Sequence, residues 1–190
     1  MLKRFIISFF ITPFLFFSIL AQASELEDGF QAFSAGNYEQ ALRLWLPLAE
    51  KDNDKAQYNL GILYNKGLGV EKNEKTAFIW YKRASANGNT DAMYNLALMY
   101  NQGRVIYRSP KDAFKWWKKA AELGNAEAQF NLGVMYVYGR SVKQNTTEAL
   151  KWWKASAKQG NKDARSVLHK TYSEGMFDVA VDPQEAKRWK

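Results

Sequence analysis

A 36-residue period is the feature that most constrains how this chain can fold. Three consecutive blocks, 59–94, 95–130 and 131–166, superimpose without a gap. A period of this size is typical of stacked arrays, in which each unit buries its apolar face against the next. The recurring positions hold Ala56, Ala92, Ala128 and Ala164; Tyr64, Tyr100, Tyr136 and Tyr172; Gly67, Gly103, Gly139 and Gly175; Trp80, Trp116 and Trp152; and Gly88, Gly124 and Gly160. We therefore expect a repeat array.

Each block contains two segments with helical periodicity. In residues 90–125, Ala92, Leu96, Met99 and Tyr100 recur at i, i+4, i+7 and i+8, which places them on one helical face. Residues 113–121 carry a second stripe with the same spacing. The sequence therefore predicts two helices in every block.

Polar residues that can cap a helix recur just before each second helix. Side chains of these types accept hydrogen bonds from the open amides of the first turn, and an acidic residue three positions later is typical of a capping box. The predicted caps are Asn37, Asn73, Ser109, Asn145 and Asp182. Glycines at fixed positions end the helices. The result is an all-α prediction of five helix pairs, at about residues 26–53, 54–89, 90–125, 126–161 and 162–190.

Residues 1–23 have the pattern of a signal peptide. Two basic residues at 3–4 precede an apolar run at 5–20, and Ala21-Gln22-Ala23 supplies small residues where a signal peptidase cleaves. The apolar run is shorter than the roughly 20 residues of a membrane-spanning helix. We expect cleavage after Ala23 and a periplasmic or secreted mature protein. The alternative is an uncleaved membrane anchor.

Cysteine content and charge restrict the partners. The chain has no cysteine, which excludes disulfides, thiolate metal sites and lipid attachment through cysteine, and suits an oxidising compartment. Residues 24–110 carry ten basic and ten acidic side chains, whereas residues 111–190 carry fifteen basic and nine acidic ones. The basic half favours an acidic partner protein or an anionic envelope surface. The alternative is a solvated, lysine-rich helix face.

The repeat resembles the Sel1-like repeat, a relative of the tetratricopeptide repeat. Its pattern is Ala-x-x-x-Leu-Gly-x-x-Tyr-x-x-Gly-x-x-Val followed by Ala-x-x-Trp-[Trp/Tyr]-x-x-Ala-Ala-x-x-Gly. One block reads Ala128-Gln129-Phe130-Asn131-Leu132-Gly133, Tyr136, Gly139 and Val142, then Ala149, Trp152-Trp153, Ser156-Ala157 and Gly160. The resemblance covers about Leu26 to Trp189.

This resemblance implies a right-handed α-solenoid whose concave face is lined by the first helix of each pair. It also implies an adaptor or regulator in the cell envelope that binds another protein. One cysteine-rich branch of the family is linked to penicillin binding and weak β-lactam hydrolysis, and this chain lacks all of that branch's cysteines.

Adjacent aromatic residues occur at Trp80-Tyr81, Trp116-Trp117 and Trp152-Trp153. Neighbouring helical residues point about 100° apart, so both members cannot face one way. The first member matches the family's packing position and is predicted to be core. The second is predicted to lie between adjacent repeats. Sugar stacking or a peptide groove is the alternative interpretation.

Rows on the first helices are the predicted protein-binding surface. In three rows the positions are equivalent in successive repeats but the residue type changes. These rows are Gln57, Met93 and Gln129; Asn65, Asn101 and Val137; and Lys66, Gln102 and Tyr138. In a fourth row, at Asn59, Asn95 and Asn131, the residue is always asparagine. The predicted contact residues are Gln57, Asn59, Lys66, Met93, Asn95, Gln102, Gln129, Asn131 and Tyr138. An extended or helical segment of another protein would lie across them. Alternatively, the asparagines bond to a neighbouring loop and only hold the stack together.

The second helices carry lysines at Lys82, Lys115, Lys118, Lys151 and Lys154. On the convex side of a solenoid such residues are interpreted as a soluble outer face. Nucleic acid is disfavoured by the predicted export.

Catalysis has little support in the sequence. His169 is the only histidine, so a site with two imidazole ligands is excluded, and we predict that His169 belongs to the carboxyl-terminal cap. No cofactor, metal site or enzymatic activity is predicted. The alternatives are an envelope hydrolase acting on β-lactam or peptidoglycan, and an oligomer in which the segment Pro183–Lys190 docks on a second copy.

Overall fold

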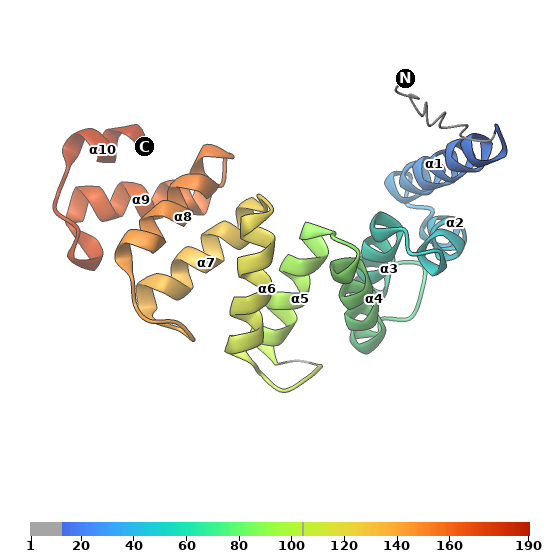
Figure 1. Cartoon of the computed structure of the whole chain (residues 1–190), viewed down its shortest axis with the longest axis horizontal. Coiled ribbons are helices and arrows are strands. Elements are labelled where there is room, and N and C mark those ends of the chain that lie inside the picture. Colours follow the sequence, from blue (N-terminus) through green and yellow to red (C-terminus); the bar gives the residue numbers. More distant parts are fainter. Residues whose placement is uncertain (1–12, 104) are drawn as a thin grey trace, which may run out of the picture.

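The computed structural model describes residues 13–103 and 105–190, with side chains from Ser24 onward. These residues form helices and no strand (Figure 1). The elements are α1 Pro13–Ser34, α2 Tyr38–Glu50, α3 Asp54–Lys66, α4 Glu74–Ala86, α5 Thr90–Gln102, α6 Pro110–Glu122, α7 Ala126–Tyr138, α8 Thr146–Lys158, α9 Lys162–Glu174, the 3-10 helix η1 Met176–Asp178 and α10 Pro183–Arg188.

Successive helices form five antiparallel pairs, from α1 and α2 to α9 and α10, and each pair contacts the next. The pairs follow one another along a curved array, with α1 and α10 at its opposite ends (Figure 1). The predicted all-α solenoid of five helix pairs is confirmed.

The helix α1 begins well before the predicted first pair. It is continuous from Pro13 to Ser34 and passes through the predicted cleavage position at Ala23. The basic residues and the first part of the apolar run, at residues 1–12, lie outside the described residues. Within the described part of the chain, no helix is both long and apolar enough to cross a membrane.

Helix caps follow the sequence closely, with one exception. Asn73, Ser109, Asn145 and Asp182 each accept a hydrogen bond from an amide of the first turn. Asn37 makes no such bond, and the prediction for it was wrong. The connection between α1 and α2 is only three residues long, and it holds Asn37 at a ψ of 62°, away from the extended conformation of caps such as Asn73.

A second set of caps was not recognised in the sequence. The first helices of pairs two to five begin after an asparagine whose side chain accepts from an amide two residues into the helix. In three of the four, the side-chain amide also donates to an acidic residue of the preceding pair. These bonds join Asn89 to Asp54 (3.0 Å), Asn125 to Asp91 (2.8 Å) and Asn161 to Glu127 (2.9 Å). One residue type therefore both starts a helix and links adjacent repeats.

The core places the aromatic pairs in the opposite order to the prediction. Tyr81, Trp117 and Trp153, the second members, are 2%, 3% and 1% exposed. The first members are only partly buried, and Trp80 packs against the core of the preceding pair. The prediction was wrong because the second member faces the small residue of its own first helix, as Trp153 does. A Cβ atom on Gly133 would lie 2.4 Å from Trp153 Nε1.

The carboxyl-terminal end is closed by α10 and η1. His169 Nδ1 donates to Ala186 O at 2.8 Å, which confirms the predicted place of His169 in the cap. Lys154 pairs with Glu185 at 3.3 Å. Phe177 of η1, which the sequence did not predict as an element, packs against Trp153 with ring centroids 5.6 Å apart.

Candidate functional site

The first of the predicted rows, which holds glutamine in two repeats and methionine in the third, does not lie on the surface. Gln57, Met93 and Gln129 are 0%, 4% and 6% exposed. The side chain of Gln57 donates from Nε2 to Ala49 O at 2.9 Å and accepts from Asn87 Nδ2 at 2.9 Å. These side chains are therefore parts of the repeat junctions, and a partner cannot reach them in this structure.

The residue changes along this row have a structural explanation. Gln129 Nε2 donates to Ala121 O at 3.1 Å, and Gln129 Oε1 accepts from Gln159 at 2.8 Å, as at Gln57 and Asn87. In the intervening repeat the two equivalent positions hold Met93 and Leu123. Both members of the polar pair are thus replaced by apolar residues together.

The asparagine row is also engaged within the solenoid. Asn95 Nδ2 donates to Asp91 O at 2.9 Å, and Asn131 Nδ2 donates to Glu127 O at 3.0 Å, one turn back on the same helix. Burial raises the pKa of Tyr58, while a hydrogen bond with Asn95 partly opposes this shift. Asn59 is buried, and among the described residues its Nδ2 has no partner. Asn95 and Asn131 therefore do not bond to a neighbouring loop, as the alternative interpretation had predicted.

Of the two rows that remain, the one at the last residues of α3, α5 and α7 lies on the surface, whereas Val137 of the other row is buried. Lys66, Gln102 and Tyr138, the last residues of α3, α5 and α7, are exposed. The ring of Tyr138 is covered on one side by the guanidinium of Arg140, whose Cζ lies 5.1 Å from the ring centroid. Exposed side chains thus mark the end of each first helix.

A cleft opens near the ends of two of these helices, α5 and α7, at the boundary between the third and fourth pairs. We call it the central cleft; its volume is about 350 Å³. The carboxyl-terminal halves of α5 and α7, the start of α6 and the two loops that follow α5 and α7 form its walls. Its lining residues are Asn101, Arg108, Pro110, Trp117, Asn131, Val134, Met135, Arg140 and Ser141.

The same cleft occurs one repeat earlier in a smaller form, which we call the upstream cleft. Its volume is about 80 Å³. Six of its seven lining residues lie 36 positions before a lining residue of the central cleft. They are Asn65, Glu74, Tyr81, Asn95, Leu98 and Met99. The cleft is therefore a feature of the repeat, and its size varies with the residues that line it.

Loop geometry positions the basic side chains of the central cleft. Gly103 ends α5 in the left-handed region, with φ of +68°, and a Cβ atom there would lie 2.8 Å from the Cβ of Arg108. Glycine thus allows the loop to fold back. Arg108 Nε donates to Asn101 O at 3.0 Å, which fixes the side chain against the end of α5.

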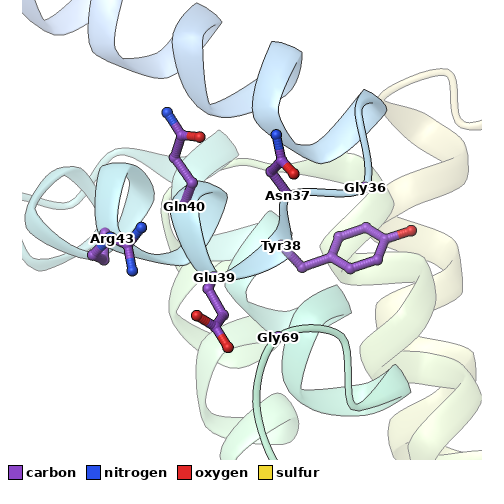
Figure 2. A pocket seen from close by; sticks show the side chains of 7 residues that line it. All are labelled: Gly36, Asn37, Tyr38, Glu39, Gln40, Arg43 and Gly69. Carbon is purple, nitrogen blue, oxygen red and sulfur yellow. The ribbon is translucent and has the colours of Figure 1, made fainter.

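A larger hollow at the amino-terminal end has no converging groups. Its volume is about 510 Å³, and it lies where α1 turns into α2 beside Gly69. The side chains of Asn37, Glu39, Gln40 and Arg43 spread in different directions there (Figure 2). This arrangement does not resemble a binding site.

Three lysines of the second helices, Lys118, Lys151 and Lys154, form ion pairs with glutamates. Lys118 pairs with Glu122 at 3.8 Å. Desolvation lowers the pKa of Lys154, but bonds with Tyr172 and Glu185 outweigh it and raise that pKa above 10.5. Among the described residues, no group of three or more histidine, cysteine, aspartate or glutamate side chains could hold a metal ion.

Comparison with solved structures identifies close relatives of this architecture. A Sel1 repeat protein from Oxalobacter formigenes has a TM-score of 0.79 and 35% sequence identity, covering 86% of this chain and 67% of its own. The protein c5321, a protective antigen present in uropathogenic Escherichia coli strains, has a TM-score of 0.78 and 29% identity, covering 88% of this chain. This chain spans only 37% of c5321.

A more distant likeness supports the fold alone. Helicobacter pylori cysteine-rich protein B has a TM-score of 0.54 and 18% identity, covering 74% of this chain and 95% of its own. None of the curated proteins compared with the chain matches it. The model of the Sel1 repeat matches residues 20–53, 54–89, 90–125, 126–161 and 170–189. Matches over nearly the whole helical array, together with the repeat geometry, show that the chain belongs to the Sel1 repeat family.

Proposed function

We propose that this protein is an exported, protein-binding scaffold of the cell envelope, and that its partner lies along the ends of the first helices. Proteins built from Sel1 repeats generally mediate protein–protein interactions. The observation that carries the proposal is the central cleft, which lies between two first helices. Its lining residues Asn101 and Arg140 adjoin the exposed Gln102 and Tyr138.

Two physical properties support binding at this surface. The cleft is built from helices held by repeat-to-repeat hydrogen bonds such as Asn125 to Asp91, so the surface is preformed and loses little conformational entropy on binding. The net charge of residues 111–190 is positive, which accelerates the approach of an acidic partner.

Photo-crosslinking in cells tests the proposal. Crosslinking residues would replace Lys66, Gln102 and Tyr138, whose exposure lets the array fold around the new side chain. Matched probes would replace Lys118 and Lys151 on the second helices. We expect one protein to be captured by the first-helix probes and not by the second-helix probes. Capture only from Lys118 and Lys151 would move the interaction to the other helix layer and refute the proposed surface.

Export is a separate part of the proposal and rests on the pattern of residues 1–23. The mature protein should begin at Ser24 and should be recovered from the periplasm or medium. Amino-terminal mass spectrometry of the purified protein measures this directly. An intact Met1 in the bulk of the protein, or recovery from the cytoplasm, would contradict export by cleavage.

A further inference from the structure

The central cleft and the upstream cleft carry different charged residues at equivalent positions of the repeat. In the second pair, Lys72 forms an ion pair with Glu74 at 3.1 Å. The equivalent residues 36 positions later are Arg108 and Pro110. The basic residue is thus kept while the carboxylate beside it is replaced by proline.

The central cleft has a second cation and no acid. Arg140 lines it together with Arg108, and none of its lining residues is acidic. Within the described part of the chain, no carboxylate forms an ion pair with either arginine. Two arginines that line one concave surface attract an anion, and the planar fork of the guanidinium group suits a carboxylate.

The next junction lacks both the basic residue and the acid. There the equivalents of Lys72 and Glu74 are Gln144 and Thr146, and neither is charged. Phe177 packs against Trp153 at this junction, and Thr146 Oγ1 donates to Phe177 O at 3.4 Å. Of the three equivalent junctions, the first contains its own acid, the last is covered by an aromatic side chain, and the middle one has uncompensated positive charge.

We propose that the central cleft binds an acidic side chain, glutamate or aspartate, of a partner segment, with Arg108 and Arg140 as the groups that recognise it. The inference rests on the proposed protein-binding function and specifies its chemistry. An internal side chain is the chosen source because the upstream cleft continues the same surface by one repeat. A segment that crosses both clefts presents a residue within the chain, and not a chain end, to Arg108.

The test uses the purified mature protein with an isotope label on nitrogen, and a defined peptide probe. Acetyl-Gly-Glu-Gly-amide is compared with the neutral acetyl-Gly-Gln-Gly-amide by NMR. The signals followed are the side-chain N–H groups of Arg108, Arg140 and Trp117, all of which line the cleft. We expect saturable shifts with the glutamate peptide only.

Two variants sharpen the measurement. Arg108→Gln introduces the residue that the array uses at the next junction, Gln144, and should weaken binding of the glutamate peptide roughly three- to tenfold. Pro110→Glu recreates the pair seen at Lys72 and Glu74 and should abolish binding, because an internal carboxylate then occupies Arg108. The control Arg43→Gln removes an exposed arginine from the amino-terminal hollow and should leave binding unchanged.

Three results would overturn the inference: equal shifts with the glutamine peptide, undiminished binding in both Arg108→Gln and Pro110→Glu, or an equal response to acetyl-Gly-Gly-Gly with a free carboxyl terminus. A circular dichroism spectrum for each variant confirms that the helices are intact. Because only the purified protein and the peptides are needed, this experiment can fail while partner capture in cells succeeds, and the reverse. The failures of the two proposals are therefore distinguishable.

Discussion

The indole of Trp153 occupies the space that a side chain on Gly133 would fill. A Cβ atom on Gly133 would lie 2.4 Å from Trp153 Nε1, and that nitrogen donates to Phe130 O at 3.1 Å, one turn earlier on the same helix as Gly133. Gly29 and Trp45 have the same relationship, with Trp45 Nε1 donating to Leu26 O at 3.3 Å. A glycine on the first helix thus admits the core aromatic of the second.

Gly133→Ala should destabilise the fold. The added methyl group displaces the indole and breaks its hydrogen bond, which outweighs the helix-favouring effect of alanine, and we expect a net loss of about 1–3 kcal/mol. Urea denaturation followed by tryptophan fluorescence measures the change. Ser166→Ala, at an exposed position of α9, is the control and should change stability by less than about 0.5 kcal/mol. A neutral Gly133→Ala would mean that the helices can separate without cost.

Ala97→Gly should allow the indole of Trp117 to form a hydrogen bond that it lacks in the unmodified protein. Trp117 is the equivalent of Trp153, but its Nε1 is buried without a hydrogen-bond partner among the described residues. Ala97 stands where Gly133 stands one repeat later, so it carries a Cβ atom at the position where the indole of Trp153 lies against Gly133. Glycine here should let the bond form and shift the indole N–H resonance of Trp117 downfield.

The expected stability change for Ala97→Gly is small. The helix loses about 1 kcal/mol through the flexibility of glycine, while satisfying a buried donor recovers a similar amount, about 1–3 kcal/mol. Ala92→Gly, at another fully buried alanine of α5, gains no hydrogen bond and should be clearly destabilising. If both variants lose the same stability and the Trp117 resonance does not move, Ala97 is not what prevents the bond.

Exchange of Asn125 and Asp91 tests the link between repeats. Asn125→Asp keeps the oxygen that accepts from Ala128 N at 2.8 Å but places a carboxylate 2.8 Å from the Asp91 oxygen that Asn125 now donates to. We expect a loss of about 1 kcal/mol, smaller at high salt because the repulsion is screened.

The reversed pair should restore that stability. In Asn125→Asp with Asp91→Asn, the donor and acceptor exchange places and the cap is kept. Thermal melts of the four proteins form a double-mutant cycle, and the coupling energy is the measured quantity. Additive losses would show that the side chains do not interact in solution.

Acid should release the carboxyl-terminal helix α10 before the rest of the array. Desolvation raises the pKa of Glu185, but bonds with Lys154, Trp189 and Arg188 outweigh it and hold that pKa below its ordinary value of 4.5. A carboxyl with a depressed pKa stabilises the fold above about pH 4.5, and this contribution is lost as the pH falls through the lower folded value.

The indole N–H resonance of Trp189 reports on this release, because Trp189 Nε1 donates to Glu185 at 3.4 Å. Between pH 7 and 3 it should broaden or move toward its unfolded position before the resonance of Trp45 does. In Glu185→Gln the separation between the two transitions should shrink. Simultaneous loss of both signals in the unmodified protein would rule out independent release of α10.

Local features of this fold were predictable from the sequence because their causes are local. The caps at Asn73, Ser109 and Asn145 and the helix-ending glycines such as Gly67 depend on a few neighbouring bonds. Asn37 failed because the three-residue turn before α2, rather than the residue type, fixed its backbone. Asparagine recurs every 36 residues at the starts of the first helices, with an acid 34 or 35 positions before Asn89, Asn125 and Asn161. This pattern was visible in the sequence and indicates the repeat-to-repeat bonds.

The candidate site was only partly predictable. Gln57, Met93 and Gln129 were predicted to bind a partner because the residue type changes along the row. The change accompanies one at the ends of the second helices, where the equivalent residues are Asn87, Leu123 and Gln159. Lys66, Gln102 and Tyr138 do lie on the surface, and their part in binding stays a prediction. Arg108 and Arg140 were missed because they lie 32 positions apart in two different loops, so no row of equivalent repeat positions contains both.

The sequence by itself determined the repeat, the two helices of each unit and the ends of those helices. Each of these follows from hydrogen bonding or helical periodicity over a few residues. Only the tertiary structure decided whether Trp152 or Trp153 is core, and which junction keeps an open cleft. The reason is that the rotation of each helix about its axis is set by packing between neighbouring repeats, and a change of about 100° exchanges buried and exposed positions.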